Sequence, residues 1–140
     1  MSITHVLDSS AFLAHALGEP GSAQVTAIWE DSANTVGISA LCIVEIKTRL
    51  REKISDPSRR TELYDLYRSL VTVLDITEEV AVEAEELRSA GKARLPLADA
   101  LIAATARLHG AILVHRDEHL AAIPPSRVAQ LVLPPRKGSR

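Results

Sequence analysis

Short runs of apolar residues alternate along the chain with longer segments in which apolar residues recur every three or four positions. The short runs are typical of buried strands, and the longer segments are typical of amphipathic helices. Because parallel strands need crossover helices between them, this alternation predicts an α/β sandwich around a mainly parallel central sheet. We expect helix content to exceed strand content.

Five segments have the length and composition of strands, and capping residues punctuate the segments between them. The predicted strands cover 3–7, 35–38, 71–76, 111–114 and, more weakly, 128–133. The helices that follow the first three strands are predicted to begin at Asp8, Ser39 and Thr77, whose side chains can accept backbone hydrogen bonds. A further helix is predicted over 97–109, which Gly110 ends.

The length of 140 residues suits one domain with a hydrophobic core and is too short for two. We expect a single domain over 1–133 and a short, basic, flexible tail over 134–140. No apolar run approaches the ~20 residues of a membrane span, and the start lacks the features of a secretory signal. Cys42 is the only cysteine, which excludes an internal disulfide. We therefore expect a cytoplasmic protein without a membrane contact.

The formal net charge of −2 gives the chain no overall attraction for a polyanion, so nucleic-acid binding would depend on local basic clusters or on a metal ion. Aromatic residues are 3% of the chain, which is too few for a base-stacking platform. Basic side chains crowd one region, where they fit either an RNA-backbone contact or a solvated face. These residues are Arg49, Arg51, Lys53, Arg59 and Arg60.

Four acidic residues stand where a fold usually places apolar groups. Asp8 directly follows the first predicted strand, and Asp117 follows the apolar run 111–114 after two residues. In an open parallel sheet, both lie at the carboxyl ends of strands, where ligand sites form. Asp99 interrupts a helix that is apolar nearly all round, and Glu45 is flanked by apolar residues early in its helix. All four are predicted to project toward one edge of the sheet.

Each acid also has a purely structural interpretation. Asp8 and Asp117 fit as helix caps, and Asp99 fits as a favourable first-turn charge. Glu45 can pair with Arg49 four residues later. Taken together the acids favour a functional site, because carboxylates at ~5 Å repel by roughly 3 kcal/mol per pair at an effective dielectric of ~20. A cation relieves that repulsion.

An all-oxygen set of ligands favours Mg²⁺ or Mn²⁺ over zinc. Such an ion can activate a bound water and neutralise the charge that develops on a phosphodiester. The acids therefore predict phosphoester hydrolysis. A rival reaction, phosphoryl transfer through a nucleophilic Asp8, lacks the second Asp expected two residues later, where Ser10 stands.

At these positions the sequence resembles the PIN-domain ribonucleases and, within them, the VapC toxins of bacterial toxin–antitoxin pairs. The matching stretches are 6–11, 39–46, 95–103 and 113–117. The resemblance implies a three-layer α/β/α sandwich and makes Asp8, Glu45, Asp99 and Asp117 the catalytic, metal-binding acids. It also implies an endoribonuclease with Mg²⁺ or Mn²⁺, a homodimer, and an antitoxin that occludes the acidic pocket. The alternative is a catalytically silent PIN-like module that binds RNA or protein.

Three further residues belong to the predicted site or its surroundings. The resemblance makes Ser10 a polar neighbour of the metal ion or its waters, and Arg116 is a candidate substrate contact because it precedes Asp117. His115 stands where many relatives have Thr or Ser, and we expect it to be exposed rather than to adjust metal or substrate contacts. The remaining histidines show no metal-ligand spacing and are interpreted as surface or core residues: His5, His15, His109 and His119.

Overall fold

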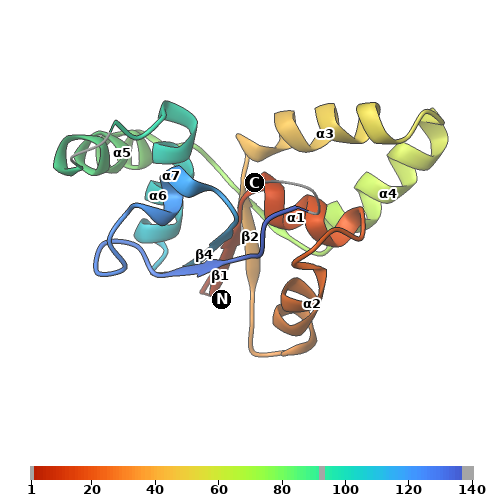
Figure 1. Ribbon diagram of the computed structural model, residues 1–140, viewed down its shortest axis with the longest axis horizontal. Coiled ribbons are helices and arrows are strands. Elements are labelled where there is room, and N and C mark those ends of the chain that lie inside the picture. The colour runs from red at the N-terminus through yellow and green to blue at the C-terminus, as the bar shows by residue number, and fades with distance from the viewer. Residues whose placement is uncertain (1, 92–93, 137–140) are drawn as a thin grey trace.

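A parallel sheet of five strands lies at the centre of the protein (Figure 1). The strand order is β3-β2-β1-β4-β5. The structure is a computed structural model that describes residues 2–91 and 94–136. The strands are β1 (His5–Leu7), β2 (Val36–Ser39), β3 (Thr72–Leu74), β4 (Ile112–His115) and β5 (Gln130–Val132). Every strand pair is parallel, so the predicted type of sheet is confirmed.

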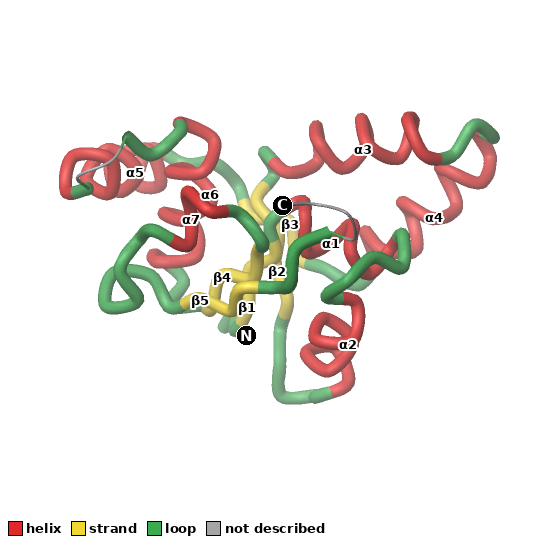
Figure 2. The backbone as a smooth tube through the Cα atoms, in the orientation of Figure 1, coloured by secondary structure: helices red, strands yellow, loops and turns green. Residues whose placement is uncertain are grey.

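Seven helices accompany the strands in the described part of the chain. They are α1 (Ser9–Ala16), α2 (Ser22–Glu30), α3 (Cys42–Lys53), α4 (Pro57–Ser69), α5 (Glu78–Ala90), α6 (Leu97–Leu108) and α7 (Glu118–Ala121). Figure 2 shows α1 and α2 on one side of the sheet and α5, α6 and α7 on the other. The α3–α4 hairpin lies on the side of α1, with which α3 is in contact. The predicted α/β sandwich is therefore confirmed.

Two of the three predicted helix caps are present, and the third is displaced. The side chains of Asp8 and Thr77 accept hydrogen bonds from backbone N–H groups three residues later, at 2.9 and 3.2 Å. The prediction for Ser39 was wrong, because this residue still pairs with Leu74 as the last residue of β2. Leu41 occupies the N-cap of α3, and its N–H donates to the Ser39 hydroxyl oxygen at 3.2 Å.

The register of the sheet brings three strand ends to the same level. Leu7 of β1 pairs with Ile38 of β2 on one side and with Val114 of β4 on the other. Each strand begins one or two residues later than predicted, and β1 begins at His5. Residues that follow β1, β2 and β4 consequently emerge at one edge of the sheet.

Helix α6 reaches the same edge with its first turn. It leads into β4, so it runs antiparallel to the strands and begins at their carboxyl ends. Small side chains let it lie close against β1 and β4, which it contacts. Its fully buried alanines are Ala100, Ala103, Ala104 and Ala106.

The remaining predictions on organisation concern membranes and the tail. No helix within residues 2–91 and 94–136 is long and apolar enough to cross a membrane. Of the predicted tail 134–140, residues 137–140 lie outside the described residues. Pro134 is held at the sheet edge, because its carbonyl accepts a hydrogen bond from Nη1 of Arg116 at 3.3 Å. The domain boundary at residue 133 stays a prediction.

Candidate acidic site

The carboxyl ends of β1 and β4 lie side by side at the point where the strand order changes direction. From there the sheet continues through β2 to β3 on one side and to β5 on the other. In open parallel sheets, the crevice outside such a point is the usual ligand site. Asp8 follows β1 directly, Asp117 follows β4 after one residue, and Asp99 lies in the first turn of α6.

Asp8 is 6% exposed, and only one of its carboxylate oxygens is held. Oδ1 accepts hydrogen bonds from the Ser10 hydroxyl at 2.6 Å and from the Ala11 N–H at 2.9 Å. Among the described residues, no group donates a hydrogen bond to Oδ2. Burial raises the pKa of the Asp8 carboxyl, although the two hydrogen bonds oppose the shift. Asp8 is therefore a helix cap through one oxygen and a candidate cation ligand through the other.

The two carboxylate oxygens of Asp117 also have different contacts. Its Oδ2 accepts a hydrogen bond from the Leu120 N–H at 3.0 Å as the cap of α7. Its Oδ1 lies 3.7 Å from Nδ1 of His119, and Oδ2 of Asp99 lies 3.9 Å from that nitrogen. One ligand atom from each of Asp99, Asp117 and His119 lies within 4.8 Å of the others. These three side chains are spaced to bind a single ion.

The titration of Asp99 reflects this crowding. Burial, the neighbouring charge of Asp117 and a hydrogen bond between the two carboxyls raise the pKa of Asp99 from 3.8 to about 6. Asp8 adds to the rise, and His119 opposes it. A carboxylate in the first turn of a helix is normally favoured by the helix dipole. The raised pKa shows that the acidic neighbours and burial outweigh that benefit.

Glu45 is exposed on α3, at the rim of this cluster. Its charge contributes to the raised pKa of Asp8. The pKa of the Cys42 thiol is raised to about 12, mainly by burial and further by the charges of Asp8 and Glu45. The suggested pairing with Arg49 was wrong, since Nη2 of Arg49 lies 4.0 Å from Oε2 of Glu19 instead. A ligand role for Glu45 stays a prediction.

Ser10 and Arg116 connect the two loops that carry Asp8 and Asp117. The Ser10 hydroxyl donates to Asp8 and accepts from the backbone N–H of Arg116 at 3.3 Å. The Arg116 side chain is 8% exposed, with Nη2 3.4 Å from Oε1 of Glu19. Burial lowers the pKa of this guanidinium, and the charge of Glu19 opposes the shift. The predicted substrate contact is thus turned into the protein toward Glu19.

The expectation that His115 is exposed was wrong. His115 is the last residue of β4, which pairs with β5, and it is 0% exposed. Its Nδ1 accepts a hydrogen bond from the Asp117 N–H at 3.0 Å. Its Nε2 lies 2.8 Å from Oε1 of Gln130 in β5. The imidazole lies beneath the acidic cluster.

His119 is the member of the cluster that sequence reasoning missed. It was interpreted as a surface or core residue because it has no ligand spacing to another histidine. The available signal was its spacing from Asp117: the aspartate caps a helix in which His119 is the second residue. The other histidines lie elsewhere. His15 contacts the Tyr67 hydroxyl, and His109 is the exposed C-cap of α6.

A family model for the PIN domain matches residues 5–124. The chain belongs to the PIN domain family. The matched region includes all four predicted acids as well as His115 and His119. A comparison with curated protein sequences finds no match.

Solved structures of two VapBC proteins and of FitAcB have the same fold. VapBC2 from Rickettsia felis, bound to a promoter DNA fragment, matches with a TM-score of 0.76 at 18% identity, over 94% of this chain and 100% of the other. DNA-bound VapBC from Salmonella typhimurium matches with a TM-score of 0.74 at 18% identity, over 93% and 98%. FitAcB from Neisseria gonorrhoeae matches with a TM-score of 0.66 at 24% identity, over 91% and 96%. At these identities the likeness shows the PIN fold.

The donors at this edge of the PIN domain fit a divalent ion. Asp8 and Asp117 each bind the backbone with one oxygen and present the other, and Asp99 has a raised pKa among like charges. Carboxylate oxygens are the ligands that Mg²⁺ and Mn²⁺ prefer, and an imidazole is compatible with Mn²⁺. An ion here would remove the repulsion that raises the pKa of Asp99.

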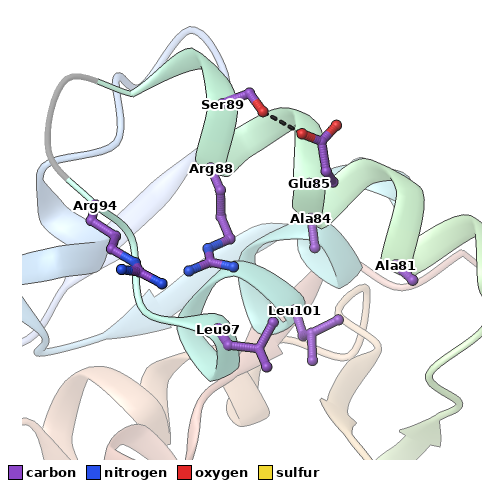
Figure 3. Close-up of a pocket in the computed structure, with 8 residues that line it drawn as sticks. All are labelled: Ala81, Ala84, Glu85, Arg88, Ser89, Arg94, Leu97 and Leu101. Carbon is purple, nitrogen blue, oxygen red and sulfur yellow. Dashed lines mark hydrogen bonds between the residues drawn. The ribbon is translucent and has the colours of Figure 1, made fainter.

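Two hollows lie near α5 and α6 of the PIN domain. One, of about 660 Å³, adjoins the acidic cluster at His119 and is lined mainly by apolar residues, with Arg94, Arg127 and Glu118 as its charged side chains. The other, of about 400 Å³, lies between α5 and α6 (Figure 3). There Glu85 accepts a hydrogen bond from Ser89, so this second hollow offers a single acid and no set of metal ligands.

The predicted basic region is partly used by the fold itself. Arg49 lies against Glu19, and Nη1 of Arg60 donates to the carbonyls of Ile54 and Ser55, at 2.9 and 3.3 Å. The two bonds of Arg60 bridge the turn between α3 and α4. The exposed basic side chains of this region are Arg51, Lys53 and Arg59.

Proposed function

We propose that this PIN domain is a metal-dependent endoribonuclease and the toxin component of a toxin–antitoxin pair. The observation that supports it most strongly is the meeting of Asp8, Asp99 and Asp117 at the switch point of the sheet, with two carboxylate oxygens presented and the pKa values of Asp8 and Asp99 raised. A structural role alone would leave this charge uncompensated. The resemblance of the four motif stretches to VapC toxins supports RNA as the substrate.

Each residue of the site has a separate role in this proposal. Asp8, Asp99 and Asp117 hold Mg²⁺ or Mn²⁺, with Glu45 contributing from the rim. A divalent ion supplies a water of lowered pKa and neutralises charge on the phosphodiester. Ser10 keeps the Asp8 carboxylate oriented through its 2.6 Å hydrogen bond. The hollow beside His119, with its two arginines, offers room for the RNA next to the bond that is cut.

A cleavage assay tests the enzymatic part. We expect the purified protein to cut single-stranded or structured RNA with Mg²⁺ or Mn²⁺ and to lose activity in excess chelator. Asp8→Asn should be inactive because it keeps the hydrogen-bonding shape and loses the charge. Asp65→Asn, an exposed substitution on α4, is the matched control. Undiminished cutting in chelator, or a fully active Asp8→Asn, would contradict the proposed metal site, whereas no cutting with either metal ion would favour a silent RNA- or protein-binding module.

The partners follow from the same proposal. The solved structures with this fold include VapBC complexes and a toxin–antitoxin complex from Klebsiella pneumoniae. We propose a cognate antitoxin that covers the acidic site, a homodimer, and action in the cytoplasm, where RNA is the target. Induced wild-type protein should arrest bacterial growth, and induced Asp8→Asn should not. Sedimentation of the purified chain tests the dimer.

A further inference from the structure

A buried imidazole joins the acidic site to the edge of the sheet. His115 is 0% exposed, and both of its ring nitrogens have partners. Nδ1 lies 3.0 Å from the backbone N of Asp117, and Nε2 lies 2.8 Å from Oε1 of Gln130. Nε2 of Gln130 in turn donates to the carbonyl of Ile123 at 2.8 Å. The contacts run from Ile123, which follows α7, through β5 and β4 to an acidic residue of the site.

The partners assign the proton on the ring. A backbone N–H can only donate, so Nδ1 of His115 must be the accepting nitrogen. The proton of the neutral ring is therefore on Nε2 and is donated to Oε1 of Gln130. The amide nitrogen of Gln130 donates to Ile123, which fixes the orientation of that amide. Each hydrogen-bonding group in the series has a partner of the correct type.

The series fixes Asp117 from two directions. Its carboxylate is held by the Leu120 N–H, and its own N–H is held by His115. A Ser or Thr hydroxyl at position 115 could accept the same N–H through a local turn, but its shorter side chain could not also reach β5. In this chain the site is therefore tied to β5 as well as to its own loop.

We propose that His115 is a positioning residue: its Nδ1 fixes the backbone of Asp117 so that Oδ1 faces Asp99 and His119, and its Nε2 anchors the ring to β5 through Gln130. This inference rests on the proposed function for the identity of the bound ion. Groups that orient ligands in this way typically change metal affinity by about 10- to 100-fold when they are removed.

Two amide substitutions separate the nitrogens of His115. The amide of His115→Asn reaches the position of Nδ1 and can accept the Asp117 N–H, whereas that of His115→Gln reaches the position of Nε2 and leaves the N–H without its partner. We expect His115→Gln to weaken Mn²⁺ binding, measured by calorimetry with the metal alone, by roughly 10-fold. His115→Asn should bind Mn²⁺ with an affinity closer to that of wild type. His109→Gln, at the exposed C-cap of α6, is the control for the change of residue type.

Amide hydrogen exchange and NMR of the ring nitrogens test the hydrogen bond from the Asp117 N–H to Nδ1 of His115 directly. The Asp117 amide should be protected in wild type and His115→Asn and should exchange about 5-fold faster or more in His115→Gln, because a hydrogen bond worth about 1 kcal/mol is lost. The wild-type ring should carry its proton on Nε2. Equal protection in both variants, or a proton on Nδ1, overturns the positioning role. Equal losses of Mn²⁺ affinity in both variants overturn it as well.

The same measurements separate this inference from the proposed function. A wild-type protein that binds no Mn²⁺ overturns the metal-dependent activity, while the Asp117 amide still decides whether His115 holds it. Melting curves of both variants identify any general loss of folding. His115→Asn and His115→Gln could lower the melting temperature equally yet differ in Mn²⁺ affinity as expected. The difference in affinity would then be due to the loss of the Nδ1 hydrogen bond and not to a change in packing.

Discussion

Arg116 and Asp117 are neighbours in the sequence, yet they belong to two charge clusters that are balanced in opposite ways. Arg116 turns inward to Glu19, which also faces Arg49, so unlike charges meet there. Asp117 faces Asp99 with Asp8 beyond it, so like charges meet. In the first cluster the charge of Glu19 opposes the effect of burial on the pKa of Arg116, whereas in the second the neighbouring charges add to it.

This comparison distinguishes charges that are paired within the protein and stabilise the fold from carboxylates that have too little opposite charge around them. Folding alone gives no reason to collect carboxylates around a half-buried Asp99, because their repulsion lowers stability. A cation bound by the proposed site would supply one. The Arg116 cluster instead joins the β4 end to Glu19 and Ser10, and its substitutions should affect stability more than metal binding.

The largest expected effect comes from Asp117→Asn, measured on cleavage. Asn caps helices as well as Asp does, so the hydrogen bond to Leu120 survives and only the charge is lost. We expect the rate of RNA cleavage to fall roughly 100-fold or more, since metal binding contributes several kcal/mol of transition-state stabilisation. The melting temperature in chelator should not fall. An active variant would show that Asp117 is only a cap.

The opposite result is expected for the Arg116 cluster, where a substitution should lower stability and leave metal binding unchanged. Glu19→Gln leaves Arg116 buried without a countercharge, which costs several kcal/mol for a fully buried pair and about 1–3 kcal/mol here because Glu19 is 20% exposed. Chemical denaturation measures the loss. Mn²⁺ affinity of the folded variant should match wild type. Glu30→Gln, at the exposed end of α2, should change neither quantity.

A smaller effect is expected for Asp99→Asn in the absence of metal. Removing one charge from the cluster should stabilise the protein by about 1 kcal/mol, which corresponds to a rise of roughly 3–6 °C in melting temperature. For a dissociation constant of ~1 mM, ~10 mM Mg²⁺ should stabilise wild type by about 1.4 kcal/mol and the variant by less. A variant that melts lower in chelator and keeps the full Mg²⁺ effect would make Asp99 a structural acid.

The sequence was sufficient for the elements and the sheet, because these depend on local pattern. Apolar runs located every strand to within a few residues, and Asp8 and Thr77 marked helix starts correctly. Ser39 failed because pairing with β3 extends β2 past the local capping signal. Strand limits depend on neighbours in space, and a local pattern cannot specify them.

The proximity of Asp8, Asp99 and Asp117 was predictable from the sequence, whereas the positions of His115, His119 and Arg116 were not. Acids after strands and in an apolar helix are unusual enough to be noticed one at a time. The burial of His115 depends on β5 covering it, and the position of His119 depends on the start of α6 lying opposite α7. The direction of Arg116 depends on Glu19, 97 residues away in the sequence. Such long-range contacts leave no local pattern.

The smallest expected effect is the pH dependence of the Asp99→Asn stabilisation. The pKa of Asp99 is about 6 in the folded protein and 3.8 at its ordinary value, so the folded state holds this proton more tightly than the unfolded state does. Its stabilising contribution is complete below pH 3.8 and is lost as the pH rises through about 6. Wild type should therefore lose stability over this window relative to the variant, which has no proton to release.

The measurable quantity is the difference in melting temperature between Asp99→Asn and wild type, taken in chelator at a series of pH values. We expect it to be near zero below pH 3.8, to grow between about pH 4 and 6, and then to level off at the value given above. Taking the difference cancels the titration of the carboxylates that both proteins share. A difference that is constant across the window would mean that Asp99 is not crowded by its neighbours, and that the two charge clusters are balanced in the same way.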